Sequence, residues 1–135
     1  MTIVVRSEYF QYHLIGDREG EPPLADDETL TVTGGNVLVA CLEQSAAVSV
    51  EHQVFVAEPT PLPTGDWDVS ADAVVACVEP LVVTSWEGDR LEPALTDGAG
   101  IWRVRLYARS GPRAARPSGV SGVVEEHVLH LWPAS

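Results

Sequence analysis

The chain has 135 residues and a formal net charge of −12, with 45% hydrophobic and 21% charged residues. This length and composition predict a single globular domain spanning residues 1–135 and exclude a largely disordered chain. Because a strongly acidic surface repels nucleic acid and anionic membranes, we expect neither as a partner.

The chain opens with MTIVVRSEYF, which lacks the basic segment and apolar run of a signal peptide. No stretch approaches the roughly 18 consecutive apolar residues of a membrane-spanning helix, so we expect a cytoplasmic protein. Cys41 and Cys77, the only two cysteines, lie in apolar runs, which predicts buried free thiols in a reducing compartment. Neither belongs to a CxxC pair, and we therefore expect no zinc, no redox motif and no cofactor.

Apolar and polar residues alternate with period two along the first half of the chain, a pattern typical of β-strands. Gly34 and Gly35 can take the positive φ of a tight hairpin turn. In residues 46–58 a row of valines that includes His52 is expected to face the core, with the alternate residues facing water. The expected strands of this half are 3–15, 30–33, 36–43 and 46–58.

The second half continues with strands joined by turns. Residues 59–66 contain three prolines and must form a connection, because proline lacks an amide donor. Trp67 and Val69 begin a further extended segment. Residues 74–78 are apolar at every position, which predicts a central strand buried on both faces, with a buried helical turn as the alternative.

Arginines alternate with apolar residues in the segment GIWRVRLYAR, residues 100–109. A strand there would bury the apolar set and present Arg103, Arg105 and Arg109 together on its outer side. If it pairs with a last strand at 123–132, Glu125 or Glu126 can lie opposite an arginine. We interpret the arginines as neutralising nearby carboxylates in preference to binding phosphate.

These elements predict an all-β fold, an antiparallel two-sheet β-sandwich of seven to nine strands with little or no helix. A partly closed barrel is the alternative architecture.

The histidines offer no metal site by their spacing. His127 and His130 resemble an HxxH pair, but residues three apart on a strand point to opposite faces and cannot chelate one ion. Glu125 and His127 do share a face, and His13 or His52 could approach them to build an acid–base pair. His52 is more readily interpreted as a core or rim residue.

No motif of a known enzyme class supports catalysis. Asp66 and Asp68 share a strand face, but their segment lacks the glycine-centred loop and terminal glutamate of a calcium hand. A solvated acidic edge that discourages aggregation is the preferred interpretation. Nucleophile-elbow, dinucleotide-binding, P-loop and zinc-protease patterns do not occur, so we expect a protein that is not an enzyme.

Several motifs in residues 66–135 resemble a group of small uncharacterised actinobacterial proteins. They are W-D-V at 67–69, W-E-G at 86–88, GIWRVRLYAR at 100–109 and VEEHVLHLWPAS at 124–135. More distantly, the order of strands, with EYFQYHLIGD at 8–17 and a glycine-aromatic strand near the end, resembles the competence protein J family, inhibitors of a DNA-entry nuclease. This second resemblance implies an acidic β-sandwich that blocks a basic nuclease, and no functional residue is carried over.

The acidic charge is concentrated in residues 1–97, whose eighteen acidic residues and three arginines give −15. Such a segment attracts a cationic partner, and the leading hypothesis is therefore a binding protein that inhibits, or confers immunity to, a basic nuclease or toxin. The candidate binding residues are Asp26, Asp27, Glu28, Asp66, Asp68, Arg103 and Arg105. The alternatives are a small-ligand-binding or hydrolytic domain built on histidine and carboxylate groups, and an assembly module that forms a homodimer.

Overall fold

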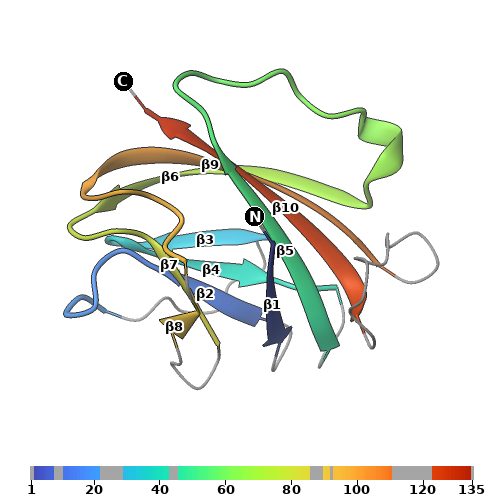
Figure 1. Ribbon diagram of the computed structural model, residues 1–135, viewed down its shortest axis with the longest axis horizontal. Helices are drawn as coiled ribbons and strands as arrows, with labels where there is room; N and C mark the ends of the chain where they lie inside the picture. Colours follow the sequence, from blue (N-terminus) through green and yellow to red (C-terminus); the bar gives the residue numbers. More distant parts are fainter. Residues whose placement is uncertain are drawn as a thin grey trace.

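Two five-stranded β-sheets pack face to face in the computed structural model of the protein (Figure 1). The structure describes residues 2–7, 11–21, 29–42, 46–85, 90–91, 93–110 and 123–134. Sheet A has the order β1-β5-β10-β9-β6, and sheet B has the order β3-β4-β2-β7-β8. The strands are β1 (Thr2–Ser7), β2 (Gln11–Ile15), β3 (Leu30–Thr33), β4 (Asn36–Ala40), β5 (Ala46–Val54), β6 (Val69–Cys77), β7 (Val82–Thr84), β8 (Arg90–Leu91), β9 (Gly100–Ser110) and β10 (Val123–Pro133).

The predicted all-β, two-sheet fold is confirmed. All strand pairs are antiparallel except β5 and β10, which run parallel in the middle of sheet A. The described residues form ten strands and a single helical turn, the 3-10 element η1 (Thr64–Asp66). Within the described ranges no helix is both long and apolar enough to cross a membrane.

The core lies between the two sheets and follows the alternation of side chains along each strand. Every second residue of β5 and β10 faces sheet B, and the same holds for β2 and β4 facing sheet A. The hydrophobic effect of removing these apolar groups from water is the main force that holds the sheets together. Core residues with no exposed surface include Tyr12, Leu14, Val37, Val39, Val48, Val50, Leu106, Leu129 and Leu131.

The segment predicted as one strand over 3–15 is two strands in different sheets, so this expectation was wrong. β1 pairs with β5 in sheet A, whereas β2 pairs with β4 and β7 in sheet B. Ile3 and Val5 are buried at odd positions, but Tyr12 and Leu14 are buried at even positions. In a continuous strand the buried residues are all odd-numbered or all even-numbered. The change from odd to even buried positions is the signal that the chain passes from one sheet to the other.

The prediction of a central strand at 74–78 was also wrong. β6 is the last strand of sheet A, and only its inner face is packed. Val75 and Cys77 are buried, but Val74 and Val78 are 45% and 65% exposed. Apolar residues on both faces therefore do not require two buried faces, because single exposed apolar side chains are common on protein surfaces.

Two predicted hairpins are confirmed. β3 and β4 are joined at Gly34, whose φ of 58° suits glycine. β9 and β10 pair antiparallel over nine residue pairs, with Arg109 opposite Glu126. The valine row of 46–58 is shorter than predicted, because β5 ends at Val54 and Val56 is 98% exposed.

Candidate functional site

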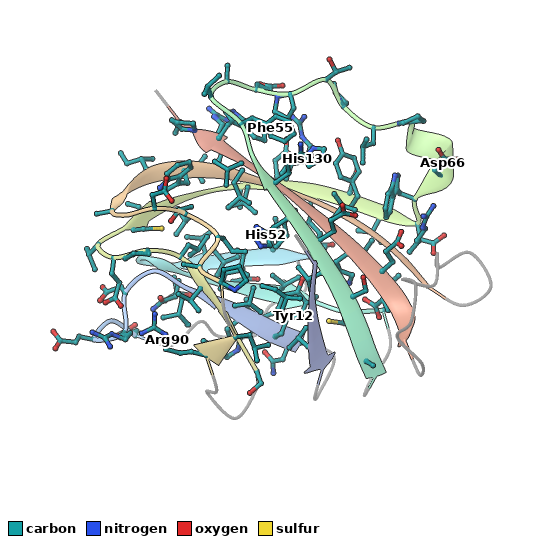
Figure 2. All side chains as sticks on the ribbon, in the orientation of Figure 1. Tyr12, His52, Phe55, Asp66, Arg90 and His130 are labelled. Carbon is teal, nitrogen blue, oxygen red and sulfur yellow. The ribbon has the colours of Figure 1, made fainter. Side chains whose placement is uncertain are left out.

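The segment 55–68 connects β5 to β6, contains η1 and passes over sheet A on the side away from sheet B (Figure 1). A row of aromatic side chains links this segment to the outer face of sheet A. The ring of His130 lies 5.0 Å from Phe55 and 5.5 Å from Tyr107, and Tyr107 lies 5.6 Å from Trp67. The backbone amide of Leu62 donates to the Tyr107 hydroxyl at 3.1 Å. Figure 2 shows Phe55 and His130 together on the side of sheet A that faces away from sheet B. These contacts hold the connecting segment against the sheet.

Two arginines of β9, Arg105 and Arg109, bind carboxylates on this face. Arg105 donates to Asp72 at 2.9 Å and to Glu58 at 3.1 Å. The hydrogen bond to Asp72 raises the pKa of the Arg105 guanidinium, although desolvation opposes it. Arg109 pairs with Glu126 at 2.6 Å and also donates to the Asp66 carbonyl. For Arg105 and Arg109 this agrees with the interpretation of the arginines as neutralising groups.

Both guanidinium groups also lie over tryptophan rings. Arg109 is 4.4 Å from the ring centre of Trp67, and Arg105 is 4.9 Å from that of Trp132. Such cation–π contacts fix the side chains further. One nitrogen of the Arg105 guanidinium, Nη1, is buried without a hydrogen-bond partner among the described residues. The same is true of His130 Nδ1.

Four of the predicted binding residues lie on this outer face of sheet A. Asp66 and Asp68 are exposed at η1 and before β6, and Arg103 is exposed on β9. Arg105 is largely covered by its ion pairs, with 12% of its side chain exposed. The other three, Asp26, Asp27 and Glu28, lie outside the described residues.

One of the exposed carboxylates, Asp72, lines a pocket of about 370 Å³. Its lining includes Leu62, Arg105 and Tyr107. We call the exposed acidic residues around this face the acidic rim; its members are Glu58, Asp66, Asp68 and Asp72. The rim is a negative surface at the edge of sheet A, with arginines beneath it.

A second polar cluster lies in the core, between the sheets. Glu125 and His127 on β10 have no exposed surface, and neither does Tyr12 on β2. His127 Nε2 contacts Glu125 Oε2, and His127 Nδ1 is 2.7 Å from the Tyr12 hydroxyl. The backbone amide of Leu42 donates to both oxygens of Glu125 at 3.0 Å. The polar side-chain atoms of Tyr12, Glu125 and His127 therefore all have hydrogen-bond partners.

The contacts of this cluster allow an arrangement in which each shared proton has a donor and an acceptor. In this arrangement the Tyr12 hydroxyl donates to His127 Nδ1, and the proton on His127 Nε2 is donated to the Glu125 carboxylate. The order resembles that of a catalytic triad with a phenol in the place of the nucleophile. Burial, followed by the charges of Cys41 and Glu125, raises the pKa of Tyr12 well above its usual value. The phenol therefore remains protonated, and full burial keeps it from a substrate.

The histidines do not support the predicted hydrolytic alternative. By strand alternation His13 lies on the outer face of sheet B and His130 on that of sheet A, whereas His127 and His52 point into the sandwich. Figure 2 shows His52 and His130 on opposite sides of sheet A. Burial lowers the pKa values of His13, His52 and His130, which favours their neutral forms.

Cys41 completes the buried cluster, and sequence reasoning missed it. A sulfur of Cys41, a carboxylate oxygen of Glu125 and a nitrogen of His127 lie within 4.8 Å of one another. The sequence showed that Glu125 and His127 share a strand face, but Cys41 and Tyr12 come from sheet B. Only the packing of the two sheets brings these four residues together.

The fold and these two clusters define a two-sheet β-sandwich with an acidic outer rim and a polar cluster in its core. Neither the protein-family models nor the curated proteins include a match to this chain. Among solved structures, the chain is similar to ComJ from Bacillus subtilis, an inhibitor of the DNA-degrading activity of NucA. The TM-score is 0.73 at 9% identity, over 99% of this chain and 96% of that one. It is also similar to the protein of crocagin biosynthetic gene J, with a TM-score of 0.57 at 12% identity over the same shares of the two chains.

The structural similarity to ComJ confirms the distant resemblance to the competence protein J family at the level of the fold. The resemblance to small actinobacterial proteins stays a prediction.

Proposed function

We propose that this protein is an inhibitor or immunity protein that binds a basic, nucleic-acid-degrading enzyme through the acidic rim. The observation that carries the proposal is the match of fold to a nuclease inhibitor along almost the whole chain. A nuclease binds the phosphates of its substrate through cationic groups, and an acidic protein surface can occupy the same groups.

The acidic rim is the described surface that fits this role best. Glu58 and Asp72 are each 59% exposed although they pair with Arg105. Asp66 and Asp68 are exposed beside them. The pairs with Arg105 fix Glu58 and Asp72 before a partner arrives, which lowers the entropy that binding must remove. The pocket behind the rim can take an apolar side chain of the partner.

A nuclease assay with a matched pair of charge variants tests the proposal. The probe is the activity of a lysate from the source organism on linear duplex DNA, measured with and without the purified protein. We expect inhibition that weakens several-fold in the double variant Asp66→Asn/Asp68→Asn. The control Glu21→Gln/Asp97→Asn removes the same charge from two other exposed positions and should inhibit like the original chain.

Raising the salt concentration is expected to weaken inhibition, because screening reduces the attraction between exposed charges. No inhibition at any excess of the protein would contradict the proposal. An equal loss in the control pair would show that overall acidity, and not the acidic rim, is responsible.

A second candidate function is self-association through β6. This strand is at the end of sheet A, and Val74, Val78 and Ile101 are exposed on and beside it. An edge strand with exposed apolar residues can pair with the same strand of a second copy. Sedimentation at several concentrations should then show a dimer that Val74→Lys abolishes. A monomer at every concentration would exclude this function.

A further inference from the structure

The cluster in the core joins the two sheets with residue types that bind transition metals. Cys41 follows β4 of sheet B, whereas Glu125 and His127 lie on β10 of sheet A. Cys41 is 7% exposed and the other two residues are completely buried. One donor atom from each lies within 4.8 Å of the other two. The proposed nuclease inhibition uses none of these atoms.

We propose that Cys41, Glu125 and His127 bind a Zn²⁺ ion that links sheet A to sheet B. Thiolate, imidazole and carboxylate are the three side-chain types that Zn²⁺ accepts in proteins. The charges also balance, since a thiolate and a carboxylate together neutralise the dication while the imidazole is neutral. A buried carboxylate is costly without such compensation.

The neighbours of the three ligands suit a metal site. A histidine that binds metal through one nitrogen usually donates its other N–H to an oxygen. The hydroxyl oxygen of Tyr12, 2.7 Å from His127 Nδ1, is placed to accept that proton. The amide of Leu42 already holds both oxygens of Glu125. Tyr12 and Leu42 therefore orient two of the ligands.

The protons that move or leave when Zn²⁺ binds can be counted from this arrangement. In the metal-free arrangement given above, the ring proton of His127 is on Nε2 and is donated to Glu125. When Zn²⁺ binds Nε2, the ring proton moves to Nδ1 and is donated to Tyr12. The Cys41 thiol loses its proton to solvent, so each ion bound releases one proton. Three protein ligands leave the fourth tetrahedral position to a water molecule.

The test uses the full chain, Zn²⁺ or Co²⁺ alone, and the two cysteines as a matched pair. Cys77 is a free thiol that is buried like Cys41, with a pKa raised by burial to about 11, but it lies beside Gly16 at the other end of β2 and β4. We expect one Zn²⁺ per chain and a thiolate-to-cobalt absorption band with Co²⁺. Cys41→Ser should lose the band and bind Zn²⁺ at least about tenfold more weakly, whereas Cys77→Ser should keep both.

X-ray absorption at the zinc edge needs no variant and covers the case in which Cys41→Ser does not fold. One sulfur ligand with nitrogen and oxygen ligands supports the site. A shell of nitrogen and oxygen alone, no stoichiometric Zn²⁺ binding, or equal binding by Cys41→Ser would each overturn the proposal. All of these readouts are independent of nuclease inhibition, so the two proposals fail separately.

Discussion

At the residue scale, the least expected feature is a glutamate, a histidine and a tyrosine with no exposed surface in the core of a β-sandwich. The three residues contact one another through hydrogen bonds: Tyr12 contacts His127, and both His127 and the Leu42 amide contact Glu125. Buried polar groups add little to stability when paired, but they cost much when a partner is lost. The cluster therefore makes the fold sensitive to single substitutions.

Tyr12→Phe tests this dependence. Removing the hydroxyl leaves Nδ1 of His127 buried without a partner, and we expect the free energy of unfolding to fall by about 1 to 3 kcal/mol. Urea denaturation of the two proteins measures the change. A loss below about 0.5 kcal/mol would mean that the hydrogen bond to His127 is dispensable.

Three histidines, His13, His52 and His130, predict a dependence of stability on pH. Burial lowers the folded-state pKa values of His13, His52 and His130 below the ordinary value of 6.5. Between the lowered pKa of the folded state and 6.5, the unfolded chain therefore binds more protons than the folded chain. The stability that the neutral histidines contribute is complete above about pH 6.5 and is lost as the pH falls below it. His130→Gln should show a smaller loss of stability between pH 7.5 and pH 5.5 than the original chain. Equal losses would exclude His130 as a contributor.

At the scale of elements, the β9–β10 hairpin carries ordered charges on its outer side. Arg109 pairs with Glu126 across the strands and lies over Trp67, with 21% of its side chain exposed. Such a partly buried ion pair is worth more than one in open solvent. The same strand also presents Arg103, which is exposed, so one element contains both a structural and a surface arginine.

Two alanine variants of β9 separate these roles. Arg109→Ala removes the pair with Glu126 and the contact with Trp67, and we expect it to lower stability by about 1 to 2 kcal/mol. Arg103→Ala on the same face should change stability by less than about 0.5 kcal/mol. Thermal or urea unfolding compares the variants, and equal effects would contradict the distinction.

At the scale of the whole molecule, acidity is the dominant property. A net charge of −12 on 135 residues produces repulsion that opposes the folded state and attracts cationic partners. Exposed pairs such as Arg18 with Glu79 offset it only slightly, because solvent-exposed ion pairs contribute little.

The thermal stability of the isolated protein should consequently rise with salt. Increasing sodium chloride from about 20 mM to about 200 mM shortens the screening length to below about 10 Å and weakens repulsion between distant carboxylates. Calorimetry should show a higher Tm at the higher concentration. A falling Tm would mean that the ion pairs on the outer face of sheet A outweigh the general repulsion.

The sequence by itself determined the fold class and the β9–β10 hairpin, because period-two alternation is a local property of each strand. It also showed that Arg109 could lie opposite Glu126 and that Glu125 shares a face with His127. Only the tertiary structure decided that residues 3–15 divide between two sheets and that β6 lies at an edge. It alone placed Cys41 and Tyr12 beside Glu125 and His127, since contacts between sheets depend on how the two faces pack, and no local pattern records that packing.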